Sequence, residues 1–418
     1  MSARRVAVIG GGAAGLVAAR ELLRAGHAPL VFEQAARIGG AWVYDPLADD
    51  DPSGRHVNQP VFSSIYASLR TNLPKDLMAF LDYPFDASGG GEDDWPRFPH
   101  HSLVLTYLER FCRDFHLQDC LRLNHQVTSV RPAGSAWQVI SSTDGKASRP
   151  MDFDAVMVCN GHYSHPRVPE LPGLEHFRGR IIHSHNYRDA SAFSHQRVVL
   201  WGAAASGTDI SREIATTATS VDWCGAALAG RYPTGSVGGV RTRAEPIGFD
   251  RQGNLLLSDQ QVLTDIDTFM FCTGYEYRFP FLSRDIVNVQ DNWVRPLYQE
   301  LVVPRHPTLA FIGLPYLVVP FPLFEIQARW FARCLAGQFE LPSQAQMEAA
   351  QEARLQQFRH AGVKTRHYHK LAEKQTEYLD QLCAQCGEPP VPDWFSELTS
   401  AAQQARLANP ENFREEPF

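Results

Sequence analysis

Short apolar runs that end in glycine-rich turns recur along the chain and predict strands that lead into helices. The first run covers 6–9, and a stretch with helical spacing of apolar residues follows it over 16–25. A second apolar run, 30–32, comes directly after that helix. Alternation of buried strands with helices predicts an α/β fold that contains a parallel sheet.

The turn after the first strand carries the glycine spacing of a dinucleotide-binding motif. Gly10 permits the tight turn, Gly12 the close approach of a pyrophosphate, and Gly15 the packing of the helix against the strand. Glu33 ends the second strand about 20 residues later, where an acid binds ribose hydroxyls. Because a carboxylate repels a 2′-phosphate, this motif favours FAD or NAD over NADP.

The same pattern of strand, glycine-containing turn and helix recurs over 198–215. Gly202 and Gly207 keep their places, but Ala204 replaces the middle glycine and is one methyl group larger. The next predicted strand, 221–224, leads to Ala226, where no arginine is available to bind a 2′-phosphate. Three arginines that could substitute lie downstream: Arg231, Arg241 and Arg243.

The remaining pattern predicts further elements. We expect a surface loop over 45–60, a helix over 103–115, a helix that opens at 324, and polar helical segments over 343–386 that pack on the outside. We expect strands over 121–130, 137–141, 153–163, 268–275 and 309–313. Prolines at 166, 169 and 172 indicate a crossing between domains.

Composition limits the function. A length of 418 residues predicts two or three domains. A net charge of −7 without a Lys/Arg cluster argues against a nucleic-acid partner. The N-terminal apolar run is too short for a signal peptide, and no run approaches the roughly 20 apolar residues of a membrane helix. We therefore expect a soluble, cytoplasmic protein.

The eight cysteines are scattered, and several lie in apolar strands, which favours reduced, buried thiols. One close pair, Cys383 and Cys386, lies in a polar helical segment and lacks a second ligand pair, so we expect no metal site. A pyridine nucleotide-disulfide reductase would need such a pair beside a nucleotide-binding strand. The position of this pair therefore argues against that class.

Between the two modules stands a motif of the form F-x-G-x-x-x-H-x-x-x-Y/F-K/R, formed by Phe177, Gly179, His183, Tyr187 and Arg188. With this motif the chain resembles the flavin-containing monooxygenases over nearly its whole length. It is most similar to the plant S-oxygenating branch, through the segments 158–163 and 182–188. Related Baeyer–Villiger enzymes carry Trp in place of Tyr187, which argues against that class. Further segments that resemble the family are 69–75, 271–275, 296–298 and 324–327.

The resemblance implies two Rossmann-like dinucleotide-binding domains, one for FAD and one for NADP, with the second inserted in the first. The FAD domain would comprise 1–165 and 282–418, and the NAD(P)H domain 166–281. The sequence leaves both a monomer and a homodimer as alternatives.

The resemblance also implies the roles of particular residues. Asn72 would be the catalytic residue, orienting the flavin and the nicotinamide, and no metal would be bound. His183 would be structural or would touch a cofactor. The FAD-binding residues would be Gly10, Gly12, Ala13, Ala14, Gly15, Glu33, Arg37, Gly40, Ala41, Trp42, Thr71, Asn72, Leu73, Val127 and Gln327. The NADP-binding residues would be Gly202, Ala204, Ser206, Gly207, Thr208, Asp209 and Arg231.

The activity implied by the resemblance is that of an FAD-dependent, N,N-dimethylaniline-type monooxygenase. NAD(P)H would reduce FAD, and O2 would form a C4a-hydroperoxyflavin that a small-molecule thioether sulfur or amine nitrogen attacks. The protein would protect this adduct from water. Baeyer–Villiger oxygenation, keto-acid decarboxylation and a non-catalytic flavoprotein are the alternatives.

Two features depart from the family. The plant branch carries an arginine where Ala226 stands, so we expect NADH to be accepted beside NADPH. Steady-state kinetics with both cofactors test this expectation, and an NADPH preference above about a hundredfold, roughly 2.7 kcal/mol, would contradict it. The second departure is the expected absence of the C-terminal membrane anchor of animal members.

Overall fold

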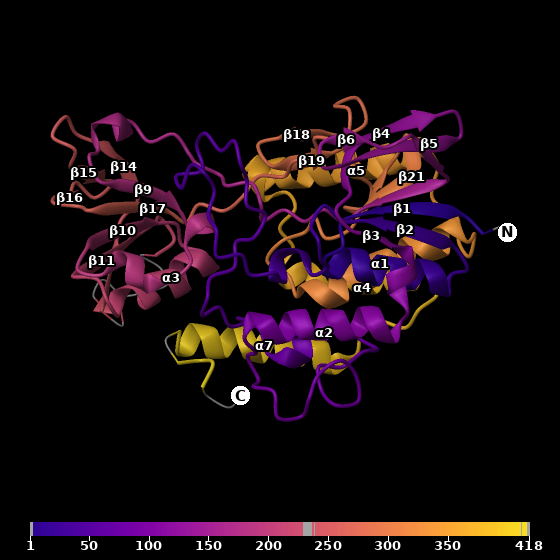
Figure 1. Cartoon of the computed structure of the whole chain (residues 1–418), viewed down its shortest axis with the longest axis horizontal. Coiled ribbons are helices and arrows are strands. Elements are labelled where there is room, and N and C mark those ends of the chain that lie inside the picture. The colour runs from indigo at the N-terminus through magenta and orange to yellow at the C-terminus, as the bar shows by residue number, and fades with distance from the viewer. Residues whose placement is uncertain (1–2, 229–235, 238, 411, 416–418) are drawn as a thin grey trace. The chain divides into compact units, whose positions relative to one another are not determined.

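A computed structural model describes residues 3–228, 236–237, 239–410 and 412–415 of the chain, which forms two compact units (Figure 1). The first unit comprises Met1–Val43, Leu73–His162 and Tyr277–Ala402, and the second Tyr44–Asn72, Tyr163–Glu276 and Gln403–Phe418. Residues 44–72 and 403–418, which the sequence analysis places in the FAD domain, thus cluster with the second unit.

The first unit is built on a six-stranded sheet in which only the β20–β21 pair is antiparallel. Strand β1 lies at its centre because Val6–Ile9 are all buried, as in a strand covered on both faces. The strands, in spatial order, are β20 (Val302–Val303), β21 (His306–Phe311), β8 (Ala155–Val158), β1 (Arg5–Ile9), β2 (Ala28–Phe32) and β3 (Leu121–Arg122).

Helix α1 (Ala13–Arg24) packs against strands β1 and β2 of this sheet, and α4 (Pro320–Leu335) lies beside α1 (Figure 1). Helix α1 begins three residues earlier than predicted, because the small residues that follow Gly12 are buried in its first turn. Helix α4 opens at Pro320 and not at Phe324. Proline suits the first helical position, where its missing N–H has no intrahelical partner.

The predicted strand over 121–130 is wrong, because this segment forms two strands in different sheets. Asn124 has a left-handed backbone with φ of 58°, which ends β3 before β4 begins. Similarly, the predicted run over 153–163 contains only β8 of the parallel sheet. The antiparallel sheet consists of β4 (Gln126–Ala133), β5 (Ala136–Thr143), β6 (Lys146–Ala147) and β7 (Met151–Phe153).

Three further helices, residues 393–402 of a fourth helix, α7, and one hairpin belong to the first unit. Apolar side chains of the C-terminal helices are buried, among them Met347, Leu379 and Leu382, as in helices that turn one face toward the core. The elements are α2 (His101–Asp114), α5 (Gln344–His360), α6 (Gln375–Gln385), α7 (Asp393–Ala408), β18 (Asn288–Gln290) and β19 (Trp293–Arg295). In the described part of the chain, no helix is long and apolar enough to cross a membrane.

The second unit repeats the strand, helix and strand order around a second sheet. Helix α3 (Ala205–Ala215) connects β10 to β11, and these two strands are parallel, with Trp201 opposite Cys224. The sheet runs β12 (Ser236–Val237), β13 (Val240–Arg243), β11 (Ser220–Cys224), β10 (Arg197–Trp201), β17 (Thr268–Phe271) and β9 (Arg180–His183). A small sheet contains β14 (Pro246–Phe249), β15 (Leu255–Leu257) and β16 (Val262–Leu263). These two sheets, each parallel except for one edge pair, confirm the predicted α/β fold with two Rossmann-type halves.

Candidate functional site

The glycines after β1 form a cradle, and two of them, Gly10 and Gly15, leave no room for an added side chain. In contrast, a Cβ on Gly12 would lie 3.4 Å from the Cα of Gly40 and make only an ordinary contact. Gly10 has φ of 108°, which favours glycine, and a Cβ on Gly15 would lie 1.8 Å from the carbonyl oxygen of Gly10. A Cβ on Gly40 would lie 2.9 Å from the Cα of Gly12. Because these residues have no side chains, the backbone of the turn is the part that a ligand would contact.

The start of α1 suits a phosphate group. Gly12 is its N-cap, and no side chain among the described residues caps the helix or places an acid in its first turn. Ala13 and Ala14 form that turn, and their side chains are small and buried. An uncapped helix N-terminus presents backbone N–H groups and a positive dipole end, which bind an anion such as a pyrophosphate. The residues of this cradle therefore fit FAD.

Glu33 lies at the end of β2 and faces the same turn. Its Oε2 accepts the N–H of Gly11 at 2.6 Å, and its Oε1 accepts the N–H of Ala35 at 2.7 Å. Burial raises the pKa of this carboxyl, although the amide hydrogen bonds oppose the shift. Two backbone bonds fix the carboxylate where the motif predicts the ribose acid.

Other predicted FAD residues of the first unit have different surroundings. Gly40, Ala41 and Trp42 form a short 3₁₀ helix, η1 (Gly40–Trp42), and the Trp42 ring packs edge-on against Phe321 at 6.4 Å between centroids. Val127 is buried on β4, and Leu73 is partly exposed. Arg37 forms an exposed ion pair with Glu109 at 2.7 Å. The Arg37 guanidinium therefore already has a partner in the protein, and its contact with FAD stays a prediction.

Gln327 on α4 has no exposed surface, and both ends of its amide are engaged. Its Oε1 accepts the N–H of Gly313 and its Nε2 donates to the hydroxyl of Tyr378, each at 2.8 Å. Tyr378 in turn donates to the carbonyl oxygen of Gln299 at 2.7 Å. The structure thus shows Gln327 joining α4 to the loop after β21, and contact with FAD stays a prediction.

Thr71 and Asn72 belong to the second unit. The carbonyl oxygen of Thr71 accepts a hydrogen bond from Arg414 Nε at 2.9 Å. Asn72 is partly exposed. Within the described residues, its amide forms no hydrogen bond, so it is available to a ligand.

The second cradle repeats the first in its backbone. Gly202 has φ of 136°, and a Cβ on Gly207 would lie 2.1 Å from the carbonyl oxygen of Gly202. Ala204 is the N-cap of α3, and no side chain among the described residues caps this helix. Its exposed methyl group replaces the predicted middle glycine without disturbing the turn.

The predicted NADP residues of this cradle are only partly available. Ser206 and Thr208 lie in the first turns of α3 and are half-buried. The Asp209 carboxylate forms an ion pair with Arg414 at 2.7 Å, so a residue near the C-terminus binds it. Arg231 lies outside the described residues.

The motif between the modules holds the second unit together. A Cβ on Gly179 would lie 2.5 Å from the carbonyl oxygen of Asp267, and Phe177 and Tyr187 are core residues. His183 is fully buried, and its Nδ1 accepts the N–H of His185 at 3.0 Å. Burial lowers the pKa of His183 to about 3, so the ring is neutral. These contacts fix the His183 ring within the second unit, and contact of His183 with a cofactor stays a prediction.

Arg188 completes this motif by binding backbone oxygens on two segments. Its guanidinium donates to Leu47 O and Ser63 O in the preceding loop, and to His185 O and Tyr187 O in its own segment. The distances range from 2.5 to 3.2 Å. Arg188 therefore explains why 44–72 clusters with the second unit.

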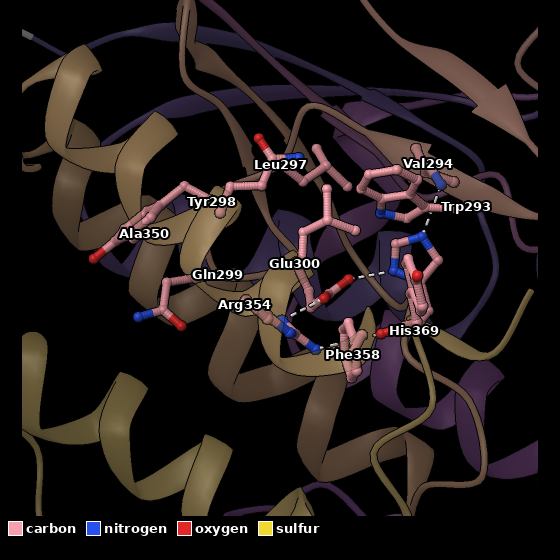
Figure 2. Close-up of a pocket in the computed structure, with 13 residues that line it drawn as sticks. Trp293, Val294, Leu297, Tyr298, Gln299, Glu300, Ala350, Arg354, Phe358 and His369 are labelled. Atoms are coloured by element: carbon pink, nitrogen blue, oxygen red, sulfur yellow. Dashed lines mark hydrogen bonds and ion pairs between the residues drawn. The ribbon is translucent and has the colours of Figure 1, made fainter. Parts of the chain in front are cut away.

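A cavity of about 190 Å³ in the first unit lies between α5 and the hairpin β18–β19 (Figure 2). Sequence reasoning missed its central groups, because Glu300, Arg354 and His369 are far apart in the chain. Glu300 pairs with Arg354 and with His369 Nδ1, while His369 Nε2 accepts the N–H of Val294 at 2.8 Å. Burial would raise the pKa of Glu300, but Arg354 and His369 hold it at about 2. Since these groups bind one another, the cavity carries no evident chemistry.

The Cys383 and Cys386 pair lies at the C-terminal end of α6, and both side chains are buried free thiols. Burial raises the pKa of Cys383 to about 12, which suppresses the thiolate that disulfide exchange requires. The pair is therefore unsuited to disulfide reduction.

Comparison with known proteins identifies relatives along the whole chain. Residues 3–230 and 233–400 match the family described as flavin-binding monooxygenase-like. Flavin-containing monooxygenase FMO GS-OX2 of Arabidopsis thaliana is 38% identical, and the alignment covers 100% of this chain and 92% of the relative. FMO GS-OX-like 4 of the same plant is 40% identical over 98% of this chain and 93% of its own.

Solved structures agree with this match. The S-allyl-L-cysteine S-oxygenase of Allium sativum has a TM-score of 0.94 and 39% identity, and the alignment covers 99% of this chain and 95% of that one. Tmm of Pelagibacter sp. strain HTCC7211 has a TM-score of 0.84 at 22% identity, which shows a shared fold. FAD and NADPH are the cofactors of this family. The two cradles and the matched length show that the chain belongs to the flavin-binding monooxygenase-like family.

Proposed function

We propose that this flavin-dependent monooxygenase uses NAD(P)H and O2 to oxygenate soft nucleophilic heteroatoms of small molecules, with a thioether sulfur as the preferred target. The likeness to an S-allyl-L-cysteine S-oxygenase over 99% of the chain carries the proposal. The first cradle supports it independently, because its glycines and Glu33 fit a flavin dinucleotide.

Each half has a defined task in this proposal. Gly10, Gly12 and Gly15 leave room for the pyrophosphate of FAD, and Glu33 holds its ribose. When bound, FAD supplies the electron transfer and oxygen activation that amino acid side chains cannot provide. Gly202, Ser206, Gly207 and Thr208 bind the nicotinamide dinucleotide at α3 in the same manner.

Asn72 is the residue that we assign to the reaction. A carboxamide donates and accepts hydrogen bonds without exchanging a proton, so it orients polar cofactor groups while adding no acid that would promote loss of peroxide. Exclusion of water by the surrounding protein completes the task.

Three substrates offered side by side test the proposal. Purified flavin-loaded protein is supplied with NAD(P)H, O2 and equal amounts of S-allyl-L-cysteine, a tertiary amine and a cyclic ketone, and the products are identified by mass spectrometry. We expect the sulfoxide to dominate, with protein lacking NAD(P)H as the control. Lactone as the main product would contradict heteroatom oxygenation, and hydrogen peroxide without organic product would contradict monooxygenation.

A further inference from the structure

The second cradle lacks an acid at the end of its second strand, where the first cradle carries Glu33. Trp201 of β10 lies opposite Cys224 of β11, as Ile9 of β1 lies opposite Phe32 of β2. Gly225 therefore takes the position that corresponds to Glu33, and it has no side chain. The cradle must obtain any ribose-binding group at this point from elsewhere in the chain.

Glu245 supplies a carboxylate to this point from a neighbouring segment. It follows β13, which runs parallel to β11, and so lies at the same carboxyl edge of the sheet. Its Oε2 accepts the N–H of Ala226 at 2.6 Å, and its Oε1 accepts the indole N–H of Trp201 at 2.9 Å. These bonds hold the carboxylate beside the ends of β10 and β11.

The hydrogen bonds resemble those of Glu33 in the first cradle. Glu33 accepts the N–H of Gly11 in the turn after β1 at 2.6 Å, whereas Glu245 accepts the N–H of Ala226 after β11 at the same distance. Glu245 is partly exposed, and each of its carboxylate oxygens can accept a further hydrogen bond. A carboxylate in this setting accepts hydrogen bonds from vicinal ribose hydroxyls.

Among the described residues, the nearby arginines do not neutralise Glu245, and Arg231 lies outside the part of the chain that the structure describes. Arg241 and Arg243 both bind Asp222 within the sheet, at 2.6 and 2.7 Å. Across the described segments, Glu245 has no ion-pair partner within 4 Å. The edge of the second cradle thus presents a negative charge where an NADP-binding enzyme presents an arginine.

We propose that Glu245 is a specificity-determining residue that binds the adenosine ribose hydroxyls of NADH and disfavours the 2′-phosphate of NADPH. This inference rests on the proposed function, in which the second cradle binds the nicotinamide dinucleotide. Coulomb repulsion between the carboxylate and a dianionic phosphate is the physical basis of the discrimination. The chain would then differ in cofactor preference from a family that uses NADPH.

Binding of oxidised dinucleotides tests the assignment without turnover. Titration calorimetry on flavin-loaded protein measures the Kd values of NAD⁺ and NADP⁺. In the unmodified protein we expect NAD⁺ to bind at least as tightly as NADP⁺. In Glu245→Gln, which keeps the shape and removes the charge, we expect the ratio of the two Kd values to shift toward NADP⁺ by about tenfold.

Two further variants make the result specific. Asp265→Asn removes an exposed carboxylate that precedes β17, at the amino edge of the same sheet, and should leave the ratio unchanged. Ala226→Arg adds a cation at an exposed position and should tighten binding of NADP⁺ and of 2′,5′-ADP, even if Glu245→Gln does not fold.

The outcomes separate the two proposals. A ratio that stays within about twofold in both Glu245→Gln and Ala226→Arg overturns the role of Glu245, while dinucleotide binding itself still supports the proposed function. Failure of the unmodified protein to bind either dinucleotide overturns both. Tight NADP⁺ binding that Glu245→Gln does not improve would assign selectivity to another group.

Discussion

At the scale of single residues, the first cradle depends on glycines that have no side chain. Gly15 packs directly against the carbonyl oxygen of Gly10, so even a methyl group at this position displaces α1 from β1. Gly26 provides a contrast, because its φ is positive, at 79°, whereas Gly15 is helical, and a Cβ on Gly26 would meet no atom within 4 Å. A substitution at Gly15 therefore tests overpacking, and one at Gly26 tests backbone strain alone.

We predict that Gly15→Ala lowers the free energy of unfolding by at least about 2 kcal/mol and abolishes FAD retention, because the clash must move the helix that faces the pyrophosphate. Gly26→Ala, the control, should cost about 1 kcal/mol from strain alone and keep FAD. Urea denaturation and the flavin absorbance of the purified proteins provide the measurement. Normal flavin content in Gly15→Ala would refute the assignment of this cradle.

Asn72 allows a prediction about chemistry. We expect Asn72→Ala to retain FAD but to lower sulfoxide formed per NAD(P)H oxidised by about tenfold, the loss expected for one hydrogen bond. Gln59→Ala, an exposed position of the same unit, is the control. Parallel assays of sulfoxide and hydrogen peroxide measure the ratio. Unchanged coupling in Asn72→Ala would remove this residue from the reaction.

At the scale of elements, the segment after β9 depends on a neutral histidine. Burial and the neighbouring His185 lower the pKa of His183 to about 3, while Asp49 opposes the shift. Because the unfolded chain binds a proton near pH 6.5 and the folded chain does not, stability is fully present above that pH. It is lost as the pH falls from about 6.5 toward 3.

We predict that His183→Asn reduces this acid sensitivity, because the asparagine oxygen can replace Nδ1 as the acceptor for His185 N–H while adding no titrating group. Unfolding free energies measured by urea denaturation between pH 7 and pH 5 should fall less steeply in the variant than in the unmodified protein. An identical slope would mean that other buried groups, such as His162 with a pKa of about 4, dominate acid unfolding.

Arg188 connects the loop before Asn72 to its own unit, and it does so through a planar fork of donors. We expect Arg188→Lys to cost about 1–3 kcal/mol, because an ammonium cannot reach all four carbonyl oxygens at once. Limited proteolysis should then cleave within 44–72 sooner than in Arg55→Lys, an exposed control in the same loop. Equal cleavage rates would contradict the role of Arg188 in fixing this loop.

At the scale of the whole molecule, the features that the sequence predicts are those that depend on residues close together in the chain. Both cradles, Glu33 and the α/β class follow from short runs whose apolar periodicity and glycine spacing lie within 30 residues. Asn124 shows the limit, because its left-handed backbone divides an apparently continuous strand between two sheets. Glu245 could not be predicted, since it reaches the β11 tip from the end of another strand.

Long-range contacts also define which segments associate. Arg414 binds Asp209 and the carbonyl oxygen of Thr71, which brings the C-terminal segment and the stretch before Asn72 into the second unit. No sequence pattern near Arg414 indicates these partners, because each pair is separated by about 200 residues or more.

The most direct test of thioether oxygenation follows the oxygen atom. Flavin-loaded protein is incubated with NAD(P)H, a thioether and ¹⁸O2. Mass spectrometry measures the ¹⁸O content and the amount of sulfoxide, and this amount is compared with the NAD(P)H consumed. The account predicts a single ¹⁸O atom in the sulfoxide and close to one product molecule per NAD(P)H. Stoichiometric hydrogen peroxide with unlabelled or absent sulfoxide would contradict it.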